Sequence, residues 1–159
     1  MGVIAMIQEL KELLDEDLIF FDVEANNWKE IFKYLSDFLL KKGYVKDSFY
    51  NALIEREMKF PTGLPTEGIK VAIPHADPVH VIKNGIAIAL LKKPVLFREM
   101  GKFEGEVECD IVFMLAIKNP DEQIKVLQNF MNIFMDSKLL MKIKNAKTKK
   151  EIIDLISLR

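Results

Sequence analysis

The run from Asp110 to Ile117 is the most hydrophobic in the chain and constrains the fold most strongly. It is far shorter than the roughly 20 residues that a helix needs to cross a bilayer. Near-continuous apolar character over so few residues is typical of a strand buried on both faces. Such a strand lies inside a sheet that other secondary structure covers on both faces, most often helices. The run therefore predicts the central strand of an α/β sheet.

The segments on either side alternate as such a sheet requires. Apolar residues at helical spacing, together with capping residues, predict helices over 3–14, 28–42, 47–60, 120–134, 138–144 and 148–158. Short β-compatible runs predict further strands over 17–23, 70–73 and 84–91, with 94–97 as a short edge strand. Two helices separate the strands at 17–23 and 70–73, so we expect a crossover that makes these two strands parallel. We expect loops over 61–68 and 98–107.

Composition narrows the class of protein. The chain has 159 residues, enough for one domain, and we expect residues 1–159 to form a single domain without linker or repeat. No leader or membrane-spanning segment is evident, so we expect a soluble, cytoplasmic protein without direct membrane insertion. A net charge of −1 argues against a nucleic-acid partner. The one cysteine, Cys109, adjoins the apolar run and is expected to be a buried, inert thiol.

His75 is the first candidate for chemistry. It follows the strand at 70–73 directly after Pro74, which cannot donate to a sheet ladder and therefore ends the strand. Open α/β sheets place their chemistry at this end of a strand. Imidazole could act there as a nucleophile, a base or a metal ligand, or could simply hydrogen-bond the backbone. His80 lacks the helical spacing of a metal pair with His75, which favours a structural role.

Two further polar residues stand out. Arg56 lies on the inward stripe of the helix at 47–60, where it could form an ion pair with Glu55, Glu57 or Asp22, extend to solvent, or bind a phosphate. Gln123 lies in the first turn of the helix at 120–134, where unpaired N–H groups favour an anion. It could equally be a solvated polar residue.

Several of these residues fall within a known signature. The sequence reads Arg56-Glu57, then Phe60-Pro61-Thr62-Gly63-Leu64, then Val71-Ala72-Ile73-Pro74-His75. This order closely resembles the enzyme IIA domains of the bacterial phosphoenolpyruvate-dependent sugar phosphotransferase system, in the fructose and mannitol class. The resemblance covers nearly the whole chain. It implies a mixed sheet of about five strands with helices packed on both faces, the phosphotransferase/anion transport protein-like fold.

The resemblance also implies a function and its residues. A protein of this kind is a phosphotransferase component that accepts a phosphoryl group from HPr on a histidine, here His75. It passes the group to a cysteine of the IIB component of a sugar permease, without cofactor or metal. Arg56 matches the arginine that neutralises phosphoryl oxygens, and Thr62 is a candidate hydroxyl donor.

Gln123 departs from the mannitol type, which has a second histidine at this position. Glutamine can donate a hydrogen bond to a phosphoryl oxygen but cannot carry a charge. The Phe60–Leu64 loop, this glutamine and the spacing from His75 to His80 look most like the galactitol-type subgroup.

Two other functions stay open. The first is a regulatory protein of the same fold, of the nitrogen type, whose phosphorylation state controls another protein. The second is a metal-dependent hydrolase that uses His75, His80 and Asp77, although no third histidine is available and Pro78 interrupts the spacing.

Overall fold

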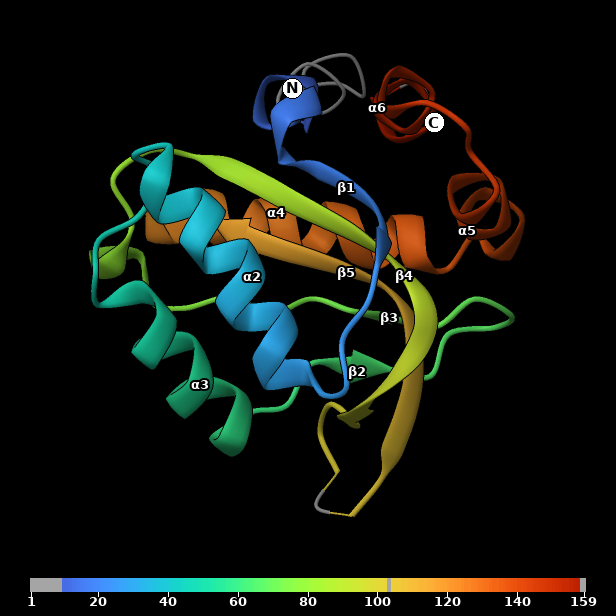
Figure 1. Ribbon diagram of the computed structural model, residues 1–159, viewed down its shortest axis with the longest axis horizontal. Coiled ribbons are helices and arrows are strands. Elements are labelled where there is room, and N and C mark those ends of the chain that lie inside the picture. Colours follow the sequence, from blue (N-terminus) through green and yellow to red (C-terminus); the bar gives the residue numbers. More distant parts are fainter. Residues whose placement is uncertain (1–9, 103, 158–159) are drawn as a thin grey trace.

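The computed structural model describes residues 10–102 and 104–157, and in this part of the chain a mixed sheet of five strands forms the centre of the molecule (Figure 1). The spatial order is β1-β4-β5-β3-β2. The pairs β1/β4 and β3/β5 are parallel, whereas β4/β5 and β2/β3 are antiparallel. The strands are β1 Ile19–Val23, β2 Gly63–Leu64, β3 Val71–Ala72, β4 Gly85–Arg98 and β5 Glu106–Ala116. The predicted fold class is confirmed.

Helices cover both faces of this sheet, also as predicted (Figure 1). Helices α2 (Trp28–Lys41) and α3 (Phe49–Lys59) pack on one face, and α4 (Pro120–Phe134), α5 (Ser137–Lys144) and α6 (Lys149–Ser157) pack on the other. Side chains alternate between faces along a strand. Thus Val112 and Met114 of β5 belong to the first core, whereas Ile111 and Phe113 belong to the second. Burial on both faces explains why residues 111–117 are apolar throughout.

Capping side chains mark the beginnings of four helices. The side chains of Asn27, Asn119 and Asp136 accept backbone hydrogen bonds in the first turns of α2, α4 and α5. Thr148 accepts a hydrogen bond from the backbone of Glu151, whose carboxylate accepts one from Lys147. Five of the six predicted helices, α2 to α6, therefore begin and end close to the expected residues.

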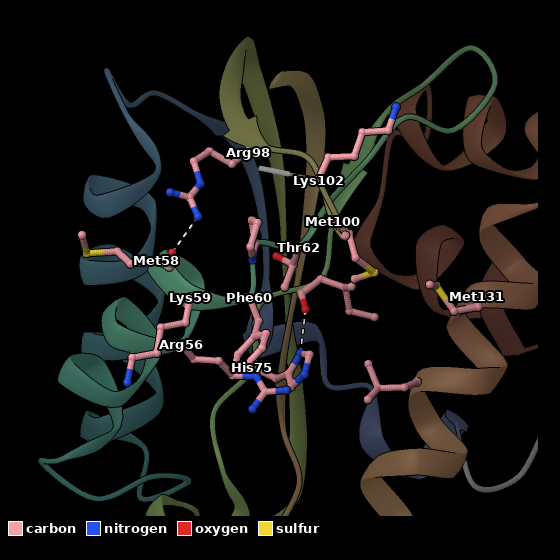
Figure 2. A pocket seen from close by; sticks show the side chains of 14 residues that line it. Arg56, Met58, Lys59, Phe60, Thr62, His75, Arg98, Met100, Lys102 and Met131 are labelled. Atoms are coloured by element: carbon pink, nitrogen blue, oxygen red, sulfur yellow. Dashed lines mark hydrogen bonds between the residues drawn. The ribbon is translucent and has the colours of Figure 1, made fainter. Parts of the chain in front are cut away.

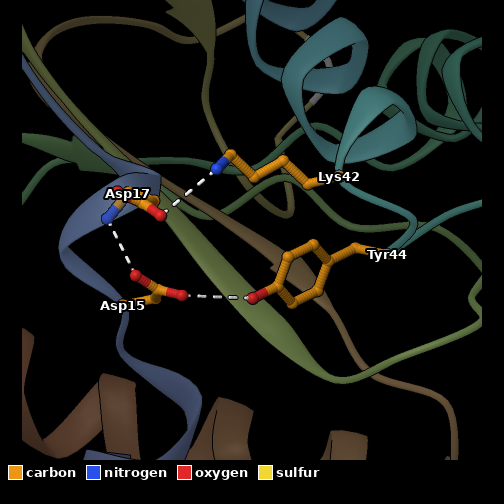
Figure 3. Close-up of polar contacts among 4 residues, drawn as sticks. All are labelled: Asp15, Asp17, Lys42 and Tyr44. Atoms are coloured by element: carbon orange, nitrogen blue, oxygen red, sulfur yellow. Dashed lines mark hydrogen bonds and ion pairs between the residues drawn. The ribbon is translucent and has the colours of Figure 1, made fainter.

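The predicted helix at 3–14 lies mostly outside the described residues, and only its last turn, 10–13, is seen to be helical. A 3₁₀ turn, Glu16–Leu18, precedes β1, so the strand begins at Ile19 rather than at Asp17. Asp15 accepts a hydrogen bond from the Tyr44 hydroxyl, and Asp17 pairs with Lys42 at 3.2 Å, which joins this segment to the loop after α2 (Figure 3). No helix in the described part is long and apolar enough to cross a membrane.

The relative direction of two strands differs from the prediction. Strands β1 and β3 are neither neighbours nor parallel, because β4 and β5 lie between them and run antiparallel to each other. The expected edge strand at 94–97 is instead the second half of β4, the strand next to β5. The ladder is irregular between Leu90 and Val95, and Pro94 falls in this irregularity, where its missing N–H costs no ladder bond. The edges of the sheet are β1 and β2, and the residues of β2 were predicted to be a loop.

Helix α4 is also turned relative to the predicted inward face. Of Ile124, Leu127, Met131 and Phe134, only Phe134 is deeply buried, whereas Ile124 is 55% exposed. The buried face contains Val126, Phe130, Ile133 and Phe134. Ring contacts fix this orientation, since Phe130 and Phe134 both pack on Phe113 of β5 at centroid distances of 5.3 and 5.1 Å.

Candidate functional site

His75 lies immediately beyond the carboxyl end of β3, as the sequence predicts. Pro74 offers its carbonyl oxygen to the N–H of Leu115 at 3.0 Å, which holds the segment beside the central strand β5. The His75 side chain is largely buried, with 7% of its surface exposed. It nevertheless lines an open cavity, described below. The ring is therefore fixed by the protein and still reachable from outside.

One hydrogen bond determines which nitrogen of this ring can react. Nδ1 lies 2.8 Å from the carbonyl oxygen of Ile73. A carbonyl oxygen only accepts hydrogen bonds, so Nδ1 carries the proton and donates. In the neutral ring, Nε2 then keeps its lone pair. Burial lowers the pKa of His75 below its ordinary value of 6.5, and the nearby charge of Arg56 lowers it further, against the opposing effect of the Ile73 bond. The ring is thus a neutral nucleophile near pH 7.

Arg56 supplies positive charge next to His75. It comes from the last turn of α3, and Figure 2 shows its guanidinium group beside the imidazole ring. Its Nη1 pairs with Asp77 at 3.4 Å, and the ring of Phe60 lies 5.6 Å from Cζ. The ion-pair partner is therefore Asp77 and not Glu55, Glu57 or Asp22, the three partners that the sequence suggested. Within the described residues the buried Nε of Arg56 has no hydrogen-bond partner, so the guanidinium retains a donor that is not used.

Contacts with neighbouring residues explain why threonine and glycine occupy positions 62 and 63. The Thr62 backbone N–H and hydroxyl both donate to the carboxylate of Glu57, at 2.8 and 2.9 Å. A Cβ atom at Gly63 would lie 2.7 Å from the carbonyl oxygen of Arg98, closer than side chains approach backbone, so only glycine fits. The Thr62 hydroxyl is thus already engaged, and donation to a phosphoryl group would require it to leave Glu57.

Gln123 contacts the segment that carries His75 rather than the cavity. Its Nε2 donates to the carbonyl oxygen of Ala76 at 2.9 Å. It is not among the residues that line the cavity. The structure therefore brings Gln123 to the residue after His75, where it supports the loop.

The cavity next to His75 has a volume of about 1020 Å³ and is open to solvent. Four cationic side chains line it, namely Arg56, Lys59, Arg98 and Lys102, and Figure 2 shows them spread along its length. Ile73, Met100, Leu127 and Met131 contribute apolar surface. Such a cavity suits an anion that is presented by a larger, partly apolar body.

The remaining candidates lie away from this chemistry. His80 pairs with Ser48, whose Oγ lies 2.8 Å from Nδ1. Cys109 is fully buried, and burial raises its pKa to about 12, so it is not a nucleophile. No group of three or more His, Cys, Asp or Glu side chains within residues 10–102 and 104–157 is placed to hold a metal ion. The hydrolase alternative therefore lacks a ligand set.

Comparison with known proteins shows the family of the chain. Residues 12–158 match the family model "Phosphoenolpyruvate-dependent sugar phosphotransferase system, EIIA 2". The chain belongs to this EIIA family. Its members are phosphotransferases that carry a phosphohistidine.

Two curated relatives carry names of specific systems. The galactitol-specific EIIA component of Escherichia coli K12 is 32% identical over 99 residues, which are 62% of this chain and 65% of that protein's own length. The ascorbate-specific EIIA component of Salmonella paratyphi A is 28% identical over 148 residues, covering 91% of this chain and 92% of the relative.

Solved structures show the same fold. The complex of the mannitol enzyme IIA with phosphorylated IIB from E. coli contains a chain with a TM-score of 0.76 and 23% identity, covering 92% of this EIIA chain and 98% of that one. The nitrogen regulatory protein IIA-Ntr of Neisseria meningitidis gives a TM-score of 0.75 at 21% identity, with coverage of 93% and 99%.

Sequence reasoning named two residues of the site but did not predict the contacts that they make. Asp77 pairs with Arg56, and its position two residues after His75 was an available signal. Glu57 binds Thr62 from inside the protein, and the signal was its place between Arg56 and the threonine-glycine loop. Both contacts depend on how α3 lies against the end of β3, which periodicity does not report.

Proposed function

We propose that this EIIA protein is a sugar-transport phosphocarrier that accepts a phosphoryl group from phospho-HPr on His75 and passes it to a cysteine of a IIB component. The observation that carries the proposal is the His75 ring itself. Its Nδ1–H is bound to Ile73, which leaves Nε2 as the nucleophile, and the Arg56 guanidinium lies beside it in an open cavity. The match of residues 12–158 to one family model supports a single EIIA domain.

Transfer to His75 requires little from the protein beyond placement and charge. The Nε2 lone pair attacks phosphorus, a P–N bond forms at His75, and the donor's P–N bond breaks with its electron pair returning to the donor ring. The His75 ring becomes cationic and keeps its Nδ1–H, so the Ile73 carbonyl stabilises it. Arg56 then exchanges Asp77, which is 72% exposed, for the phosphoryl oxygens. In the second step a cysteine thiolate of IIB attacks phosphorus and a P–S bond forms. The P–N bond at His75 breaks, and its electron pair returns to Nε2.

Apolar surface around the cavity fits a protein as donor and acceptor. Phe60 is 63% exposed at its rim. Leu127 and Met131 line the cavity and also a shallower hollow on α4 that Ile124 borders. Exposed aromatic and methionine side chains grouped in this way are typical of protein interaction sites. The turned orientation of α4 produces this surface, because it places Ile124 and Met131 outward.

We assign the protein to the galactitol type, on the resemblance of the Phe60–Leu64 loop and on the 32% identity to the galactitol-specific component. The ascorbate-specific component matches over more of its length at lower identity. A test with the IIB proteins of both systems therefore decides between the two types. We also propose a cytoplasmic location for the protein, in keeping with its family.

The proposal is tested by incubating the protein with phosphoenolpyruvate, enzyme I and HPr. We expect one acid-labile phosphate per chain, absent in His75→Ala and retained in His80→Ala. His80 is the matched control because it is the other histidine of the chain and lies on the same loop. Label that persists in His75→Ala would refute the proposal.

A regulatory role is the second candidate. The nitrogen regulatory protein has the same fold, so the fold does not separate the two functions. Adding galactitol-type and ascorbate-type IIB proteins to the labelled protein does separate them. Transport requires the phosphate to move to the IIB cysteine, whereas a purely regulatory protein would keep it.

A further inference from the structure

Glu57 is a buried carboxylate that the proposed mechanism does not use. It lies on α3, is 4% exposed and follows Arg56 directly in the sequence. Its Oε2 accepts the Thr62 N–H at 2.8 Å, and its Oε1 accepts the Thr62 hydroxyl at 2.9 Å. Placing a carboxylate inside a protein is costly unless its lone pairs are satisfied. Thr62 satisfies both oxygens with its two donors.

The hydrogen bonds of Thr62 continue to the reactive ring. The carbonyl oxygen of Thr62 accepts the N–H of Ile73 at 3.3 Å. The carbonyl oxygen of Ile73 accepts the Nδ1–H of His75 at 2.8 Å. Glu57 is thus joined to His75 through two intervening residues. The bond that fixes the tautomer of His75 is the last bond of this series.

A second series of contacts fixes the helix end from which Glu57 projects. Arg98 donates to the carbonyl oxygen of Met58 at 2.6 Å, which satisfies a terminal carbonyl of α3. Gly63 accepts the N–H of Met100 at 2.8 Å, which ties the loop to the end of β4. The loop around Thr62 is therefore held on one side by the β4 end and on the other by Glu57.

The titratable groups near Glu57 come from three elements. Arg56 on α3 and Arg98 on β4 favour its ionised form, and the thiol of Cys109 on β5 lies close enough to interact with it. Burial acts against ionisation and is the largest effect, so the pKa of Glu57 is raised to about 7. An apolar residue at this position would avoid that cost but would leave both donors of Thr62 unpaired.

We propose that Glu57 is a positioning residue for phosphoryl transfer, which holds Thr62 and through it the Ile73 carbonyl that keeps His75 in its Nδ1–H tautomer. This inference rests on the proposed role of His75. It predicts that loss of Glu57 alters the reactive ring without touching it. Glu57 acts through Thr62 and Ile73 and contacts no substrate.

The test compares Glu57→Ala, Glu57→Gln and the control Glu55→Gln, an exposed glutamate on the same helix. Two quantities are measured: the ¹⁵N shifts of the His75 ring in the unphosphorylated protein, and the rate and KM of phosphorylation by phospho-HPr. In Glu57→Ala we expect a mixture of tautomers and a transfer rate at least tenfold lower, with KM changed less than twofold. Glu57→Gln keeps one acceptor for Thr62, so we expect it to restore part of the wild-type tautomer and part of the transfer rate. Glu55→Gln should match the wild type in both measurements.

A folded Glu57→Ala protein with the wild-type tautomer and rate would overturn the inference. Should that variant fail to fold, Thr62→Val and Thr62→Ser decide. Valine removes the hydroxyl that donates to Glu57, so Thr62→Val should reproduce the tautomer change. Serine keeps this hydroxyl, so Thr62→Ser should keep the wild-type tautomer. Equal behaviour of the two would also overturn the inference. Failure of the proposed function is distinct, because the wild type would then take up no phosphate, while the ring shifts would still report on Glu57.

Discussion

The raised pKa of Glu57 predicts how the stability of the protein depends on pH. Its ordinary value is 4.5, and in the folded protein it is about 7. The folded state therefore binds the proton more tightly than the unfolded state. This contributes stability that is fully present below pH 4.5 and is lost as pH rises to about 7. One pKa unit corresponds to about 1.4 kcal/mol, so the loss attributable to Glu57 is ~3 kcal/mol.

The measurement is the free energy of unfolding by urea at intervals from pH 4 to pH 8, for the wild type and for Glu57→Gln, which cannot titrate. The difference between the two proteins should shift by ~3 kcal/mol in favour of Glu57→Gln across this range. The lowered pKa of His75 acts in the opposite direction, with stability rising as pH increases to 6.5. That effect is common to both proteins and cancels in the difference. Parallel curves for the two proteins would refute the reasoning, and Glu55→Gln should follow the wild type.

Three further substitutions probe other parts of the site. Arg56→Ala should slow phosphoryl transfer to His75 by about a hundredfold while the urea midpoint stays close to wild type, because its ion-pair partner Asp77 is 72% exposed and such a pair adds little stability; a protein that unfolds instead would contradict this. Gly63→Ala should lower the free energy of unfolding by roughly 2–3 kcal/mol, measured by urea denaturation, because its Cβ would meet the Arg98 carbonyl; an unchanged midpoint would count against the close approach. Gln123→Ala should cost about 1 kcal/mol from the lost hydrogen bond and reduce the transfer rate only a few-fold; a loss as large as for Arg56→Ala would make Gln123 a direct phosphoryl ligand.

Local signals in the sequence predicted the elements of this fold well, because caps and helix ends depend on neighbouring residues. Asn27 and Asn119 begin their helices in the structure as the capping patterns indicate. The Asp110–Ile117 run is the central strand because only a strand covered on both faces tolerates such a composition.

Predictions that depended on distant partners were wrong. The direction of β3 relative to β1 is set by the antiparallel β4/β5 pair between them, which no local pattern reveals. The inward face of α4 is set by packing of Phe130 and Phe134 on Phe113, although Ile124 and Met131 fit an equally good helical stripe.

The residues of the site also differ in whether a local sequence pattern could predict them. His75 and Arg56 were found because each interrupts a local pattern: His75 follows a strand-ending proline, and Arg56 occupies an apolar stripe. Glu57 was missed as a functional residue because its partner, Thr62, is joined to it across the end of α3, where no helical or strand spacing applies.

The position of phosphorus on the His75 ring tests the central claim most directly. Protein labelled with ¹⁵N in histidine is phosphorylated by phosphoenolpyruvate, enzyme I and HPr, and the ³¹P–¹⁵N coupling is measured. The Nδ1–H bond to Ile73 predicts phosphorus on Nε2 of His75, with Nδ1 still protonated. Phosphorus on Nδ1, or on any other residue, would contradict the account.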